Sequence, residues 1–68
     1  MSNEMRFLMF ATEYYRAKKG LSGKQLADLF EEHAIYDLIL NNYFLYHIES
    51  PDHFVSEIDA VIKAGSLG

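Results

Sequence analysis

The sequence predicts an all-α fold, a small bundle of four short helices that forms a single helical domain over residues 1–65. Three observations support this prediction. Apolar residues recur at the three- and four-residue spacing of a helical face along most of the chain. Residues that typically start and stop helices lie between these stretches. Half of the 68 residues are apolar, which is enough for one packed core.

The first helix is expected over residues 3–19 and to end at Gly20, since glycine is the common residue just past a helix C-terminus. Its inward face is predicted to hold Phe7, Leu8, Ala11, Tyr14, Tyr15 and Lys18, with Arg6, Glu13 and Arg16 opposite. The apolar arc is wider than one small core needs, because Met5, Met9 and Phe10 extend it on both flanks.

A capping box predicts the start of the second helix. The Ser22 side chain is expected to accept a hydrogen bond from the backbone of Gln25, whose own side chain reaches back to Ser22. Leu21 before the cap and Leu26 four residues after it have the spacing of a hydrophobic staple. This helix is expected to fray near residues 33–34.

The stretch 35–48 is almost continuously apolar. We expect it to be helical, with a break or kink at Asn41 and Asn42 and an irregular segment near residues 41–50. A β-strand over residues 43–48 is the alternative, because this run is aromatic and ends in a β-branched residue. An isolated strand would lack a partner in this chain, which favours the helix, and the choice between helix and strand stays open at this point.

The last helix has clear boundaries in the sequence. Ser50 is expected to cap it, Pro51 suits its first turn, and Asp52 complements the helix dipole. Its inward stripe is predicted to be Phe54, Val55, Ile58, Val61 and Ile62. Gly65 is expected to end it, and residues 66–68 to form a disordered tail.

Composition and charge exclude several classes of function. The chain has no cysteine, so disulfides, zinc ribbons and thiol nucleophiles are excluded. Its net charge of −4 repels a phosphate backbone, makes nucleic acid an improbable main partner and favours a basic one. No stretch approaches the roughly 18 apolar residues that cross a bilayer, and no basic signal region opens the chain. We therefore expect a cytoplasmic protein without a membrane partner.

Two histidine pairs are the candidates for chemistry. His33 and Asp37 are four residues apart, a spacing that suits metal ligation, but two ligands do not define a site. Tyr43 and His47 are also four apart in the most apolar stretch, where a buried histidine is more often structural than catalytic. We therefore predict no metal, no cofactor and no enzymatic activity.

Residues 21–27 resemble the opening of a helix-turn-helix. The polar, basic recognition helix that should follow is missing, because the chain continues with Glu31 and Glu32 and then with the apolar residues 35–40. The alternative hypothesis is nevertheless a dimeric DNA-binding regulator, with phosphate contacts from Arg16, Lys18, Lys19 and Lys24.

The surplus of aromatic and methionine side chains favours protein binding instead, because these residue types are enriched at protein interfaces. We predict a non-enzymatic protein-binding module whose partner is another protein or a second copy, with a homo-oligomer expected. The predicted contact residues are Met5, Met9, Phe10, Tyr14, Tyr43, Tyr46 and His47.

The order of these features resembles a family of short bacterial proteins of unknown function. The matching residues are Phe7, Phe10, Glu13, Tyr14 and Tyr15, the turn 21–24, Leu29 and Phe30, Asp37, Ile39, Tyr43 and His47, and Ile58 with Asp59. Tyr46 and residues 48–51 depart from the family's pattern. Genes of that family often lie beside putative ADP-ribosyltransferase-like toxins, so the resemblance implies an accessory or antitoxin-like role.

Overall fold

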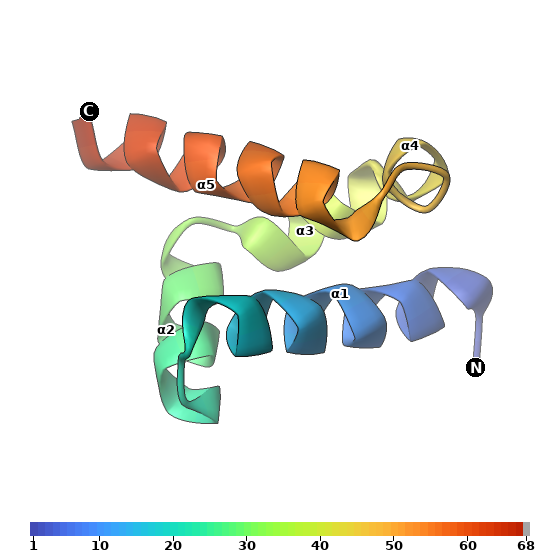
Figure 1. Cartoon of the computed structure of the whole chain (residues 1–68), viewed down its shortest axis with the longest axis horizontal. Helices are drawn as coiled ribbons and strands as arrows, with labels where there is room; N and C mark the ends of the chain where they lie inside the picture. The colour runs from blue at the N-terminus through green and yellow to red at the C-terminus, as the bar shows by residue number, and fades with distance from the viewer. Residues whose placement is uncertain (68) are drawn as a thin grey trace.

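The computed structural model describes the backbone of residues 1–67 and the side chains of residues 1–65. The described chain is all-helical and has no strand, so the predicted fold class is confirmed. It contains five helices instead of the expected four, because the third apolar stretch divides in two. The helices are α1 (Asn3–Lys19), α2 (Gly23–Glu32), α3 (Ile35–Asn41), α4 (Tyr43–Tyr46) and α5 (Pro51–Leu67) (Figure 1).

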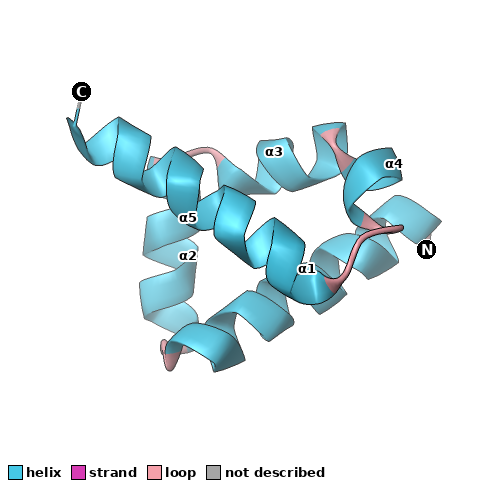
Figure 2. Cartoon of the chain, turned by 45° about the horizontal axis from the view of Figure 1, so that its top comes forward, coloured by secondary structure: helices cyan, strands magenta, loops and turns pink. Residues whose placement is uncertain are grey.

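The helices are arranged along a molecule that measures 32 × 22 × 19 Å. The long helices α1 and α5 run in the same direction along the molecule, and α3 runs back in the other direction (Figure 1). Helix α2 stands across one end of the molecule, while α4 and the start of α1 lie at the other end in both views (Figures 1 and 2). The molecule therefore has two ends built from different elements.

Local capping fixes α1 and the corner that follows it. The Ser2 side chain accepts a 3.1 Å hydrogen bond from the Met5 amide at the start of α1. Gly20 adopts a left-handed conformation with φ of 66°, which ends α1 where the sequence predicts. Both bonds of the capping box form, since the Gln25 amide donates to Ser22 Oγ at 3.1 Å and the Ser22 amide donates to Gln25 Oε1 at 2.8 Å.

The connection between α2 and α3 is a two-residue break. His33 is the C-cap residue of α2, so this helix ends at the position where it was predicted to fray. Ala34 has a φ of 54° and is the one non-glycine residue among residues 1–67 with positive φ. A left-handed residue cannot continue a right-handed helix, so α3 starts afresh at Ile35 in a new direction.

Asn42 separates α3 from α4, which confirms the predicted break. Its side-chain amide donates to the Leu38 carbonyl at 2.8 Å and so satisfies a carbonyl near the end of α3. The alternative strand over residues 43–48 is wrong, because local hydrogen bonds close a helical turn. The Tyr46 amide donates to the Asn42 carbonyl, and the His47 amide to the Tyr43 carbonyl, each at 2.9 Å.

Helix α5 does not end at Gly65 as predicted, but continues to Leu67. Gly65 has a packing role there, because a Cβ atom at this position would lie 2.9 Å from Nδ1 of His33. The missing side chain lets α5 approach the end of α2. Of the expected tail, residues 66 and 67 continue α5, and Gly68 lies outside the described residues.

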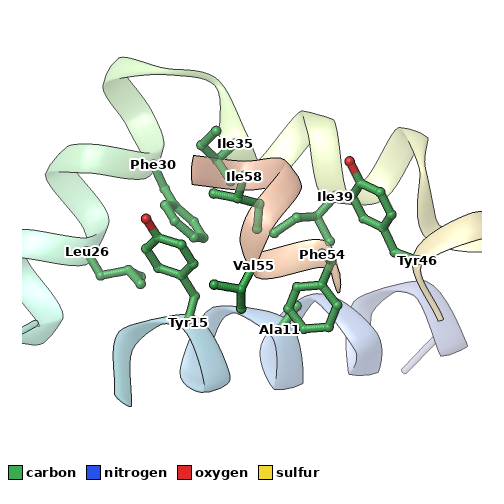
Figure 3. Close-up of a cluster of buried hydrophobic side chains, with 10 residues drawn as sticks. All are labelled: Ala11, Tyr15, Leu26, Phe30, Ile35, Ile39, Tyr46, Phe54, Val55 and Ile58. Atoms are coloured by element: carbon green, nitrogen blue, oxygen red, sulfur yellow. The ribbon is translucent and has the colours of Figure 1, made fainter. Parts of the chain in front are cut away.

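All five helices contribute to the core (Figure 3). Its buried side chains are Ala11, Tyr15, Leu26, Phe30, Ile35, Ile39, Tyr46, Phe54, Val55 and Ile58. Four of the five residues in the predicted stripe of α5 pack in or against this core. Val61 is the exception, with 38% of its surface exposed, because it lies at the edge of the stripe while Ile62 packs against the core.

Candidate functional site

The three flanking residues of α1 that were predicted to bind a partner are all at the surface. Met5 is 44% exposed, Met9 58% and Phe10 47%. Ala11 and Tyr15 form the side of α1 that faces the core. Met5, Met9 and Phe10 lie outside that side and therefore remain at the surface. They form an apolar outer surface on the first half of α1.

Tyr14 and Tyr43 are half-buried and leave only part of each ring accessible. The Tyr14 hydroxyl donates a 2.8 Å hydrogen bond to Asp52 of α5. This bond is the main cause that raises the pKa of Tyr14. The Tyr43 ring packs edge-on against Phe7 of α1 at a centroid distance of 5.6 Å. Both tyrosines therefore border the surface and join α1 to its neighbours.

Tyr46 is not available to a partner in this structure, because only 4% of its surface is exposed. It lies one helical turn after Tyr43 in α4, so both rings face inward, and its ring reaches that of Phe54 at 6.4 Å. Burial is the first cause that raises the pKa of Tyr46, and the charge of Glu57 adds to it. Its predicted contact role is corrected to a core role.

His47, one of the predicted contact residues, is exposed. Its ring stacks on Tyr43 at 4.4 Å with only 11° between the ring planes. Its Nδ1 lies 2.9 Å from the Tyr43 carbonyl oxygen and donates to it when that nitrogen carries the proton. The ring thus closes the C-terminus of α4 and presents its other face to solvent.

Three exposed apolar residues were absent from the predicted site. Phe44 is 79% exposed, Leu45 48% and Ile48 68%. The signal was present in the sequence, because a helical turn buries one face only and residues 43–48 are apolar on nearly every side. Once Tyr43 and Tyr46 face the core, Phe44 and Leu45 must face water.

A series of ring contacts joins Phe10 of α1 to Phe44 of α4. The series runs from Phe10 to Phe7 at 6.1 Å, from Phe7 to Tyr43, from Tyr43 to His47, and from His47 to Phe44 at 5.6 Å. We call this region the apolar end, and define it by the exposed side chains of Met5, Met9, Phe10, Phe44, Leu45 and Ile48. It lies where α1 begins and α4 turns (Figure 1).

The total surface of the protein is not unusual. Its accessible area is 4452 Å², close to the roughly 4,400 Å² expected for a compact monomer of this mass. The chain is therefore fully folded on itself, and the apolar end is not the inner side of an unclosed core. The unusual feature of this surface is the number of large apolar side chains that it exposes.

The opposite end carries acidic groups. Glu31 and Glu32 are exposed at the end of α2, and Asp37 is exposed in the first turn of α3. We call these three residues the acidic end. His33 and Asp37, the candidate metal pair, lie on different helices because Ala34 breaks the chain between them. Residues 1–67 contain no group of three side chains placed to bind a metal ion, and no pocket opens among them.

The four basic residues of the DNA-binding hypothesis are paired with carboxylates. Arg16 pairs with Glu13, Lys18 with Asp52, Lys19 with Asp59, and Lys24 with Asp28. Two of these pairs belong to a repeated arrangement that sequence analysis missed. Tyr14 and Lys18 both contact Asp52, and Tyr15 and Lys19 both contact Asp59. This arrangement fastens α1 to α5 and leaves little free positive charge on α1.

No helix among the described residues is both long and apolar enough to cross a membrane. Comparison with known proteins gives no match among curated proteins and none among solved structures. One family model, described as "Protein of unknown function (DUF3791)", matches residues 6–65. This match includes part or all of every helix of the structure. The chain therefore belongs to the DUF3791 family.

Proposed function

We propose that the protein is a non-enzymatic protein-binding module that contacts its partner through the apolar end. One observation carries the proposal: six large apolar side chains of α1, of α4 and of the turn after α4 are each at least 44% exposed. Exposed apolar patches of this kind mark interaction sites, because water-exposed apolar surface is unfavourable and its burial drives association. Met and Phe are also among the residues enriched at interfaces.

The ring packing around Phe10 supports the same proposal. Phe10 rests on Phe54 at 6.2 Å, and Phe7 joins both Phe54 and Tyr43. Side chains held in this way lose little conformational freedom on binding, so less of the interaction energy is spent on ordering them. Phe10 is accordingly suited to contact a partner without further ordering.

The finer proposal is an accessory or antitoxin-like partner of a neighbouring protein in the bacterial cytoplasm. It follows from the family resemblance and the sequence, and the apolar end is the surface it would use. The alternative, a DNA-binding regulator, has less support, because Arg16, Lys18, Lys19 and Lys24 are engaged by carboxylates. Each would have to exchange an existing ion pair for a phosphate contact.

Affinity capture with matched variants tests the proposal. The tagged protein is incubated with the products of adjacent genes, and the recovered complex is quantified for the wild type, for Phe44→Ser with Ile48→Ser, and for Glu31→Gln with Glu32→Gln. We expect the wild type and the acidic-end control to recover a stoichiometric partner and the apolar-end variant to lose it. Equal recovery by all three would assign binding to another surface and reject the proposal.

A further inference from the structure

We propose that the outer face of α1 binds a carboxylate of a partner protein, and that Arg6 receives this carboxylate between the exposed side chains of Met9 and Phe10. The inference rests on the proposed function and adds the chemistry of the partner at one point of contact. Three properties of the chain support it: the pairing of its basic residues, the spacing of residues on α1, and the shape of the guanidinium group.

Arg6 is an exposed basic residue without a carboxylate partner. Four of the six basic residues of the chain form ion pairs with carboxylates. Among the side chains of residues 1–65, Arg6 forms no ion pair. No residue three or four positions away from it on α1 is acidic, so its own helix offers no partner. Its guanidinium donors are therefore available to a group from another molecule.

Met9 and Phe10 lie beside Arg6 on one face of α1. They follow it by three and four positions, a spacing that makes side chains neighbours on the surface of a helix. Met9 is 58% exposed and Phe10 47%, whereas Ala11 and Tyr15 point from the other side of α1 into the core. The outer face of α1 thus presents one positive charge bordered by two apolar side chains.

This combination fits an acidic side chain with apolar neighbours on a protein surface. A guanidinium is planar and can donate to both oxygens of one carboxylate. Apolar groups around such a pair exclude water, which strengthens the attraction between opposite charges and makes a basic group in the same place unfavourable. Arginine, methionine and aromatic residues are also the types enriched at protein interfaces.

The net charge of −4 favours a basic partner at long range, but it does not decide this contact. Charges are screened over about 8–10 Å at physiological salt, so the groups that touch Arg6 determine what it binds. A phosphate backbone is a poorer occupant than a carboxylate, because nucleic acid binding depends on several basic residues acting together. The other basic residues of α1, which are Arg16, Lys18 and Lys19, are already paired with carboxylates.

Selection of peptides from a displayed random library on the purified protein tests the inference. We expect the recovered peptides to be enriched in Asp or Glu beside apolar residues. Arg6→Gln should weaken their binding by at least about tenfold, because the carboxylate loses its partner. Arg6→Glu should abolish it, and replacing the acidic residue of the peptide by Lys should restore binding to this variant.

Lys63→Gln is the matched control. Lys63 is the other basic residue without an ion pair among the side chains of residues 1–65. It belongs to the last turns of α5, which lie at the opposite end of the molecule from the start of α1 (Figure 1). This substitution removes the same charge as Arg6→Gln and should leave peptide binding unchanged. Circular dichroism confirms that each variant is folded.

Three outcomes would overturn the inference: peptides without enriched acidic residues, peptide binding that both Arg6 variants leave unchanged, or tighter binding of random-sequence DNA that Arg6→Gln removes. The capture experiment above separates this failure from failure of the proposed function. If a captured protein is lost with Phe44→Ser and Ile48→Ser but retained by both Arg6 variants, the carboxylate contact is wrong and the protein-binding proposal stands. If capture depends on none of these residues, both proposals fail.

Discussion

The two ends of the molecule share one core but expose different chemistry. At the acidic end, polar residues interrupt α2 at helical spacing, so that Leu26 and Phe30 are buried while Glu31 and Glu32 face water. At the apolar end, α4 has only four residues and is apolar on all sides. A short helix at the surface of a small domain can bury one face only, so an all-apolar turn leaves apolar surface exposed.

The comparison of the two ends distinguishes side chains that should stabilise the fold from side chains that should bind a partner. The core side chains at both ends should determine whether the chain folds, while the outer side chains of the apolar end should determine what it binds. The predictions that follow test this separation, beginning with changes that should unfold the protein.

The largest effect is expected from Phe54→Ala at the apolar end and Phe30→Ala at the acidic end. Both side chains are at most 1% exposed. Each substitution should lower the free energy of unfolding by about 3–5 kcal/mol, since it removes a buried ring and leaves a cavity. Urea unfolding measures both. If Phe54→Ala cost less than half as much as Phe30→Ala, the aromatic packing at the apolar end would be loose, and the two ends would not share one core.

Tyr15→Phe should have the next largest effect. The Tyr15 hydroxyl, from a residue only 3% exposed, donates a 2.6 Å hydrogen bond to Asp59. Losing a bond to a charged acceptor should cost about 1–3 kcal/mol at neutral pH. The corresponding change at Tyr14, whose bond to Asp52 is solvent-exposed, should cost less.

The same tyrosine predicts a dependence of stability on alkaline pH. Burial, followed by the hydrogen bond to Asp59, raises the pKa of Tyr15 above its ordinary value. A group with a raised pKa in the fold stabilises it fully below the unfolded pKa, which is about 10 for tyrosine, and this stability is lost as pH rises above that value. Unfolding measured from neutral pH to above pH 10 should show this loss. The loss should be smaller in Tyr15→Phe but not absent, because the pKa values of Tyr14 and Tyr46 are also raised.

The sequence best predicts those features of the structure that depend on interactions between residues close together in the chain. The end of α1 and the start of α2 follow from Gly20, Ser22 and Gln25, residues that act within one turn of their own position. These boundaries are confirmed. Where a local pattern was ambiguous, as in residues 43–48, the helical prediction held because no other strand exists among the described residues to pair with this one.

The errors come from contacts between distant residues. Gly65 has the local appearance of a helix stop, but its function is set by His33, which is 32 positions away in the sequence (65 − 33) and in contact with it. Tyr46 and Phe44 are both aromatic residues in one apolar run, and the packing of α4 on the core, where Tyr46 reaches Phe54, decides which of them is buried. The exposed residues of the predicted surface were identified at α1, whereas Phe44, Leu45 and Ile48 were missed.

A double-mutant cycle at His33 and Gly65 tests this long-range contact. Gly65→Ala alone should change stability little, because the gain of about 1 kcal/mol in helix propensity is offset by displacement of the His33 ring. In a His33→Ala background the ring is absent, and the same substitution should stabilise the protein by roughly 0.5–1 kcal/mol. Thermal unfolding of the wild type, the two single variants and the double variant gives the coupling free energy between the two positions. A coupling of zero would mean that Gly65 is not needed for the approach of α5 to α2.

The smallest effect on stability is expected where the effect on binding is largest. Phe44→Ser and Ile48→Ser replace side chains that are more than two-thirds exposed. Without a partner, each should change the free energy of unfolding by no more than about 0.5 kcal/mol, as should the control Asp37→Ser at the acidic end. With a captured partner present the variants should separate, because the partner stabilises the folded wild type and the control but not the apolar-end variants. Unfolding measured with and without the partner therefore shows whether the exposed side chains of α4 serve folding or association. A large loss for Phe44→Ser without the partner would place this residue with the core and end the distinction between the two surfaces of α4.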